Sequence, residues 1–238
     1  WIDTDIGDDP DDTVALWCAH KSDDAELVGV STVDGDVAAR ADIVRSLLPG
    51  VDVVAGAPPP EKLATVDVLV GIGPWTNVAT LADAGVLPRR VVLMGGVLGR
   101  VQHRDQWHQI EHNIGRDPAS AARLLATVGE MIVLPLNATA RLHVHERDEE
   151  LLVGTIPFLG AQLRSWRELH GSVPFVLHDP AAVLIGIGEN VERTESKRLQ
   201  VEPDGTLRAS ITGPVQQLVA HVDVSATRSR VRELAQQG

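Results

Sequence analysis

The feature that most constrains this chain is the alternation of short apolar runs with stretches of helical periodicity. The apolar runs are rich in Val, Leu and Ile, and most neighbouring runs enclose a helical pattern. Strands that alternate with helices of this length form βαβ units and a parallel sheet. The runs are apolar almost throughout, which is typical of strands that helices cover on both faces. The sequence therefore predicts an α/β fold with an open, mostly parallel sheet and helices on both faces.

The expected elements extend along the whole chain. The first strands are expected at residues 1–3, 27–32, 51–54, 66–70, 91–94 and 131–134. The first helices are expected at residues 11–20, 37–48, 76–84 and 118–128. Later helices are expected at 158–170, 179–187 and 225–236, and later strands at 199–201, 207–211 and 218–222. A length of 238 residues suits one large domain, and we see no repeat or linker, so we expect a single domain over residues 1–238.

The charge of the chain limits its class of partner. The formal net charge is −12, whereas a protein that binds a nucleic acid polymer carries a basic surface. An excess of carboxylates suits a bound cation or a neutral small molecule better. No apolar run is long enough to span a bilayer, and the single cysteine, Cys18, cannot form an intrachain disulfide, which is compatible with a reducing compartment. We expect a cytoplasmic enzyme without a membrane partner.

The strongest chemical signal is a cluster of aspartates near the start of the chain. Six carboxylates fall within ten residues, at Asp3, Asp5, Asp8, Asp9, Asp11 and Asp12. Such crowding at the end of a buried strand is electrostatically unfavourable unless a cation offsets the repulsion. Ligands that are all oxygen favour a hard ion, calcium or magnesium, over zinc.

A simpler interpretation explains part of this cluster. Asp9 before Pro10 is typical of a helix N-cap followed by proline, and Asp11 and Asp12 would interact favourably with the helix dipole. Capping suits Asp8 and Asp9, but it does not explain Asp3 and Asp5 at a strand end. We therefore favour a metal site.

A second signal lies far along the chain, in the segment Leu177-His178-Asp179-Pro180. A His-Asp pair that opens an apolar helix can supply a remote carboxylate ligand and a titratable imidazole together. By itself the signal is weak, because Asp before Pro is a common helix start and a lone histidine is more often structural than catalytic.

Together these segments resemble the inosine-uridine type nucleoside hydrolases. Six motifs occur in that family's order: DTDIGDDPDDTVAL at 3–16, STVDGD at 31–36, GPWTNVA at 73–79, VVLMGG at 91–96, EHNIGRDP at 111–118 and HDP at 178–180. One such match can arise by chance, whereas six in the same order are highly specific.

The resemblance implies hydrolysis of the N-glycosidic bond of ribonucleosides, with calcium as the cofactor. Calcium would be held by Asp5, Asp12, Asp179 and the backbone carbonyl of Ile72. Asp5 would act as general base for a calcium-bound water, and His178 would protonate the departing base. The remaining substrate-binding residues would be Asp11, Asp36, Met94, Glu111, Asn113 and Trp166, with Asp179 also contacting the ribose. The family also implies a homodimer or homotetramer.

Two regions depart from the family. Residues 57–64 take the place of a much longer segment that includes a lid loop, so the site is either more open or closed by another subunit. Residues 97–110 form a longer and unusually polar run with Arg100, His103, Arg104, Trp107 and His108. That run either replaces the lid or is a solvated loop. Asp36 also stands where many members have Asn.

Aromatic residues leave a further choice. Trp17 and Trp75 suit a core or interface position on a helix, whereas Trp166, four residues before His170, is equally suited to the core or to stacking on a nucleobase.

Two other functions compete with nucleoside hydrolysis. A haloacid-dehalogenase type phosphatase also begins with a strand and Asp-x-Asp, but Gly7 stands where Thr or Val is needed and no paired aspartate follows Lys197. A shortened, inactive relative that binds a ribosyl ligand or serves as a structural subunit is the stronger alternative. The shortened lid region favours it, and the intact set of aspartates with Asn113 and His178 argues against it.

Overall fold

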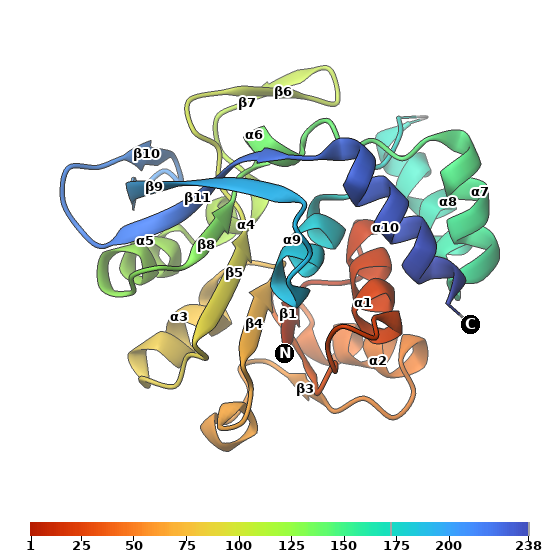
Figure 1. The fold of residues 1–238 in the computed structure, drawn as a ribbon, viewed down its shortest axis with the longest axis horizontal. Coiled ribbons are helices and arrows are strands. Elements are labelled where there is room, and N and C mark those ends of the chain that lie inside the picture. The colour runs from red at the N-terminus through yellow and green to blue at the C-terminus, as the bar shows by residue number, and fades with distance from the viewer. Residues whose placement is uncertain (172, 238) are drawn as a thin grey trace.

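A nine-stranded sheet with helices on both faces forms the body of the protein in the computed structural model, which describes residues 1–171 and 173–237 (Figure 1). The strand order is β10-β9-β11-β8-β5-β4-β1-β2-β3. These strands are β1 Ile2–Thr4, β2 Val30–Thr32, β3 Val53–Ala55, β4 Val68–Gly71, β5 Arg90–Met94, β8 Ile132–Leu134, β9 Glu192–Val201, β10 Leu207–Ala209 and β11 Val215–Val222. All pair in parallel except β9, which is antiparallel to both β11 and β10.

Helices and a small hairpin fill the connections. The helices are α1 Asp11–Lys21, α2 Val37–Leu47, α3 Thr76–Asp83, α4 His112–Arg116, α5 Pro118–Thr127, α6 Leu136–Thr139, α7 Glu146–Thr155, α8 Leu159–His170, α9 His178–Ile187 and α10 Val224–Gln236, with a 3₁₀ turn η1 at Pro60–Leu63. The hairpin consists of β6 Val101–His103 and β7 Gln106–His108, and Figure 1 shows it outside the layers of sheet and helix.

Alternate side chains of the central strands enter two separate cores. Val70 and Val92 belong to the core that α1, α2, α9 and α10 cover, while Leu69 and Leu93 belong to the core beneath α3 and α5. Because strand side chains point alternately to the two faces, apolar residues at consecutive positions are buried on both sides. The predicted α/β class and the mostly parallel sheet are therefore confirmed.

The expected elements agree with the structure to within a few residues, with six exceptions. The strand β9 begins at Glu192 rather than at 199, because it pairs with β11 from Glu192 to Arg198. Its mostly exposed, charged sequence hides the strand signal. Regular structure was also not expected at the hairpin β6–β7, the 3₁₀ turn η1 and the helices α4, α6 and α7.

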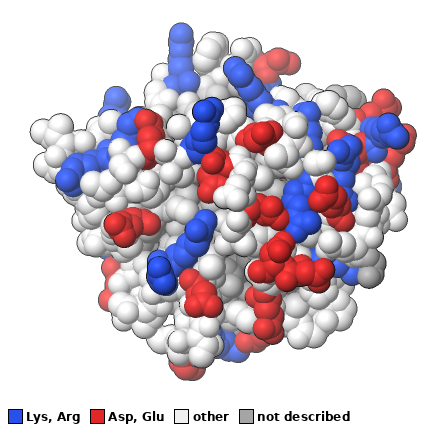
Figure 2. Space-filling model, in the orientation of Figure 1, with Lys and Arg blue, Asp and Glu red and all other residues white. Residues whose placement is uncertain are grey.

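Charged side chains of both signs lie close together on the face shown in Figure 2. Arg230 on α10 pairs with both Glu189 and Asp24. Within the described part of the chain, no helix combines the length and the apolar character needed to cross a bilayer.

Candidate active site

A cavity of about 320 Å³ lies at the carboxyl ends of the central strands. Open parallel sheets place their ligands at this edge. Every residue expected at the site lines the cavity except Asp36: Asp5, Asp11, Asp12, Ile72, Met94, Glu111, Asn113, Trp166, His178 and Asp179. The structure thus brings together residues from the first and last thirds of the chain.

Arg40 on α2 holds the loop between β1 and α1 in place through hydrogen bonds. Its guanidinium donates hydrogen bonds to the backbone carbonyls of Asp5 and Ile6 and pairs with the carboxylate of Asp8 at 3.0 Å. A glycine is also required opposite this loop, because a Cβ atom at Gly73 would lie 2.9 Å from the backbone nitrogen of Asp5. These contacts fix where the aspartates enter the cavity.

Three buried carboxylates form the first group at the cavity. Oxygen atoms of Asp11, Asp12 and Asp179 lie within 4.8 Å of one another, and all three side chains are buried. Burial raises the pKa of each, and repulsion by neighbouring carboxylates raises it further. Such a group, made of oxygen donors alone, fits a hard divalent cation, which would remove this electrostatic penalty.

Two of these carboxylates are held in place by hydrogen bonds. The Asp11 carboxylate accepts the backbone N–H groups of His178 and Asp179, each at 3.2 Å, and so caps the first turn of α9. The Asp12 carboxylate accepts the hydroxyl of Thr4 at the end of β1. The first turns of α1 and α9 are therefore joined at the cavity.

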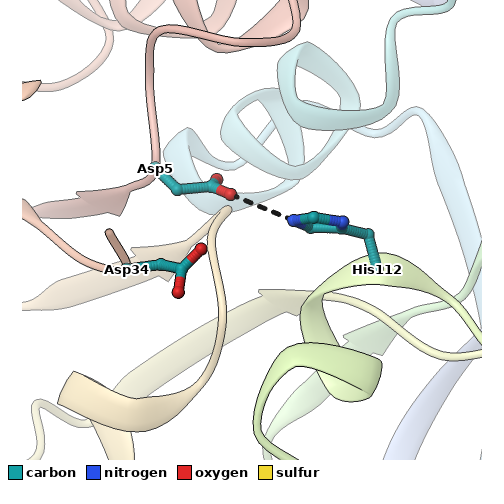
Figure 3. A group of neighbouring side chains, drawn as sticks. All are labelled: Asp5, Asp34 and His112. Atoms are coloured by element: carbon teal, nitrogen blue, oxygen red, sulfur yellow. Dashed lines mark ion pairs between the residues drawn. The ribbon is translucent and has the colours of Figure 1, made fainter. Parts of the chain in front are cut away.

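Asp5 belongs to a second group, together with Asp34 and His112 (Figure 3). Its carboxylate lies 3.6 Å from Nε2 of His112, and this contact raises the pKa of His112. Asp34 is held by two bonds from Arg116, at 2.8 and 3.1 Å. The charge of Asp5 also raises the pKa of Asp12 and Asp179, so Asp5 lies near both groups.

Glu111 and Asn113 build the wall beside α4. The buried Glu111 carboxylate caps this helix and accepts the N–H groups of Gly96, Asn113 and Ile114 at 2.9, 2.8 and 3.2 Å. The Asn113 amide donates to the carbonyls of Ile72 and Met94 at 3.1 and 3.2 Å. A carbonyl oxygen has two lone pairs, so this bond leaves Ile72 able to accept one further partner.

His178 lies buried at the opening of α9. Its Nδ1 lies 2.7 Å from the hydroxyl of Thr139, and its ring meets the edge of His103 at a centroid distance of 4.9 Å. Burial lowers the pKa of His178, and the nearby His103 and Arg104 lower it further.

Several expectations about the aspartates need correction. Asp36 does not line the cavity, since its carboxylate caps α2 by accepting the N–H of Ala39 at 3.0 Å. Asp3 does not line the cavity either: one oxygen of its carboxylate accepts hydrogen bonds from Ser31 and Asn77, at 2.6 and 2.9 Å, and the other is buried without a partner among the described residues.

The capping expected of Asp8 and Asp9 is also wrong. The N-cap of α1 is Pro10, and no side chain among residues 1–171 and 173–237 caps this end. Asp9 pairs instead with Arg104 at 3.0 Å, and Asp8 pairs with Arg40. The loop therefore uses its outer aspartates to bind arginines from two other segments.

Residues 97–110 are divided between cavity and solvent. His103 and Arg104 line the cavity, while Trp107 in β7 is exposed. His112 also lines the cavity and was not expected there, although it stands between two residues that were.

Trp75 is a core residue, buried, with its indole N–H donating to the Met94 carbonyl at 3.0 Å. Trp166 is buried at the cavity wall beneath the Arg104 guanidinium.

A known protein family and a curated relative each match most of this chain. The profile of the inosine-uridine preferring nucleoside hydrolases matches residues 57–230. An uncharacterized protein of Schizosaccharomyces pombe is 25% identical over 268 residues, covering 87% of this chain and 85% of that protein.

Solved structures share the fold at low sequence identity. A plant nucleoside hydrolase matches with a TM-score of 0.82 and 17% identity, covering 98% of this chain and 97% of its own. A purine-preferring ribonucleoside hydrolase from Gardnerella vaginalis matches with a TM-score of 0.79 and 21% identity, covering 100% and 99%.

The profile match, together with the fold, defines an enzyme that cleaves N-ribosyl bonds. The chain belongs to the inosine-uridine preferring nucleoside hydrolase family, as its motifs predicted. Members of this family are metal-dependent and act on small nucleosides, and the aspartate group at the cavity can bind a metal ion.

Proposed function

We propose that this enzyme hydrolyses ribonucleosides to free base and ribose with calcium as its cofactor. The observation that carries the proposal is the buried group of Asp11, Asp12 and Asp179, which opens on the same cavity as His178. Crowded carboxylates of this kind are stable when a cation lies among them.

The proposed ligands are Asp5, Asp12, Asp179 and the carbonyl of Ile72. Asp11 is the least available of the buried aspartates, because one of its oxygens accepts two N–H groups of α9. We therefore assign Asp11 to the ribose hydroxyls, with Glu111, Asn113 and Asp179. When bound, calcium would lower the pKa of a coordinated water and contact the ribose hydroxyls.

Two residues of the chain, Asp5 and His178, handle the protons of the proposed reaction. Asp5 accepts a proton from the attacking water while the water oxygen bonds to C1′ of the ribose. The bond from C1′ to the base nitrogen breaks, its electron pair stays on the base, and His178, which has to be protonated although burial lowers its pKa, supplies the proton that the base needs. Nearby carboxylates stabilise the positive charge that develops on the ribosyl ring. To act in this way, Asp5 must give up its contact with His112 and contact the attacking water instead.

A panel of purine, pyrimidine and modified nucleosides tests the proposal. Release of reducing sugar from at least one ribonucleoside, lost with a chelator and restored by calcium, is the expected result. An inactive relative would release no sugar from any of them. We do not favour that alternative, because the cavity retains its aspartates, Asn113 and His178.

The expected oligomer and location belong to the same proposal. We propose a homodimer or homotetramer in the cytoplasm. Light scattering on the purified enzyme tests the first point, and cell fractionation tests the second.

A further inference from the structure

The hairpin β6–β7 places one permanently charged cation against the cavity. Among the described residues that line it, Arg104 is the only Lys or Arg, whereas several are carboxylates. Its guanidinium pairs with Asp9 at 3.0 Å and lies over the ring of Trp166, 4.8 Å from the ring centre. Two separate contacts thus hold this charge in one position.

The turn that carries Arg104 has an unusual backbone. Arg104 and Asp105 join β6 to β7 with φ angles of 49° and 61°. Two-residue hairpin turns with positive φ at both positions normally use Asn, Asp and Gly, so Arg104 is the unusual residue of this turn. Strain of this kind is found where function requires one side-chain direction. Here the turn directs Arg104 to the cavity.

Polar atoms beside the cavity also lack partners. The Nε donor of Arg104 and Nδ1 of His103 are buried and have no hydrogen-bond partner among the described residues. Buried polar groups are almost always paired, so the unpaired Arg104 donor and His103 ring nitrogen beside a cavity point to partners that a ligand supplies. His103 in turn contacts His178, which places this part of the hairpin beside the proposed donor of the leaving-group proton.

We propose that Arg104 is a catalytic residue that contacts the departing base and stabilises the negative charge it acquires. This inference rests on the proposed function. When the bond from C1′ to nitrogen breaks, the electron pair passes to the base, and a fixed guanidinium can donate hydrogen bonds to its ring nitrogen or carbonyl oxygen. The ligand class is a nucleobase with an acceptor toward the hairpin. Trp166 supports Arg104 from beneath, and its ring is not free to stack on the base from that side.

The test compares substrates that differ in leaving group. Arg104→Met keeps the length of the side chain and its packing on Trp166 but removes the charge and the donors, whereas Arg104→Lys keeps the charge. Arg100→Met is the matched control, because Arg100 lies over the exposed Trp107 and does not line the cavity. For each variant, kcat/KM is measured on inosine, uridine and nitrophenyl riboside.

Arg104→Met is expected to lose on the order of 10²-fold on the nucleosides, as when one stabilising donor of a developing anion is removed. Nitrophenyl riboside, whose leaving group needs little help, should change only a few fold. Arg104→Lys should fall between, and Arg100→Met should match the wild type. An equal loss on both substrate types, or no loss on either, overturns the proposal.

A failure of the proposed function can be distinguished from a failure of the proposed role of Arg104. If the wild type cleaves none of the substrates, the proposed function fails, and binding of free hypoxanthine and uracil decides the role of Arg104. Binding that is at least tenfold weaker in Arg104→Met than in Arg100→Met supports contact with the base. Equal binding in both variants, or no binding to the wild type, overturns it.

Discussion

The carboxylate of Asp11, the first residue of α1, accepts the backbone N–H of Asp179 in the first turn of α9 at 3.2 Å. This bond joins two residues that are 168 positions apart and brings two buried negative charges together. One group thus serves both as a helix cap and as a member of the acidic site.

The double role of Asp11 predicts opposite effects on stability and activity. In Asp11→Asn the side-chain oxygen still accepts the α9 N–H groups, but the repulsion among the buried carboxylates is reduced. The midpoint of thermal unfolding in chelator should therefore rise, while nucleoside hydrolysis falls. Asp11→Ala, which also removes the cap, should lose about 0.5–2 kcal/mol relative to Asp11→Asn. A lower midpoint in Asp11→Asn than in the wild type would contradict this account.

Calcium binding should depend on Asp179 from the far end of the chain. Asp179→Ala removes a proposed ligand, so titration calorimetry should show no calcium binding and the variant should not turn over. Asp36→Asn is the control, because Asp36 lies outside the cavity and caps α2. Unchanged calcium affinity in Asp179→Ala would show that the ligands are misassigned.

The proposed contacts to the sugar predict discrimination against 2′-deoxyribosides. A buried acceptor that loses its donor costs about 1–3 kcal/mol, which corresponds to about 5- to 150-fold in kcat/KM. The kcat/KM values of inosine and deoxyinosine should therefore differ by a factor within this range or above it. Comparable values of kcat/KM for the two would exclude the proposed role of Asp11 and Asn113.

His178 should matter most for bases that depart badly as anions. His178→Ala is expected to lose about 10²- to 10⁴-fold on natural nucleosides, to retain activity on nitrophenyl riboside and to keep its calcium affinity. Thr139→Val, which removes the hydroxyl beside Nδ1, should show a smaller loss of the same kind. Equal losses on both substrate types would indicate positioning rather than proton donation, and retention on both would make His178 structural.

The buried Asp3 predicts a pH-dependent gain from substitution. Burial raises the pKa of Asp3 to about 7 in the folded chain, above the usual value near 4 for an unfolded one. The folded state therefore holds this proton longer, and the associated stability, present below about pH 4, is lost as the pH rises through about 7. Urea unfolding in chelator should thus show Asp3→Asn gaining more stability over the wild type at pH 8 than at pH 5. The same difference at both pH values would contradict the assignment.

Much of the fold and the site could be predicted because short-range patterns carried the information. Apolar runs marked the buried strands, and ordered motifs marked Asp5, Asn113 and His178. The role of Asp3 could not be read, because its partners Ser31 and Asn77 come from separate segments. The first part of β9, before residue 199, was not predicted because its charged side chains follow no apolar alternation. The turn at Arg104 was not predicted because it lacks the Asn and Gly of common hairpins.

The two edges of the sheet limit how copies of the enzyme can assemble. The outermost strands, β3 and β10, are each only three residues long. The β3 edge thus offers few free backbone donors and acceptors, whereas residues 192–198 of β9 extend beyond β10 and are protected by their mostly exposed, charged side chains instead. Both edges therefore disfavour a dimer or tetramer that continues the sheet from one subunit into the next. An oligomer held by contacts between helices and loops would leave the strand register of each subunit independent of its neighbours.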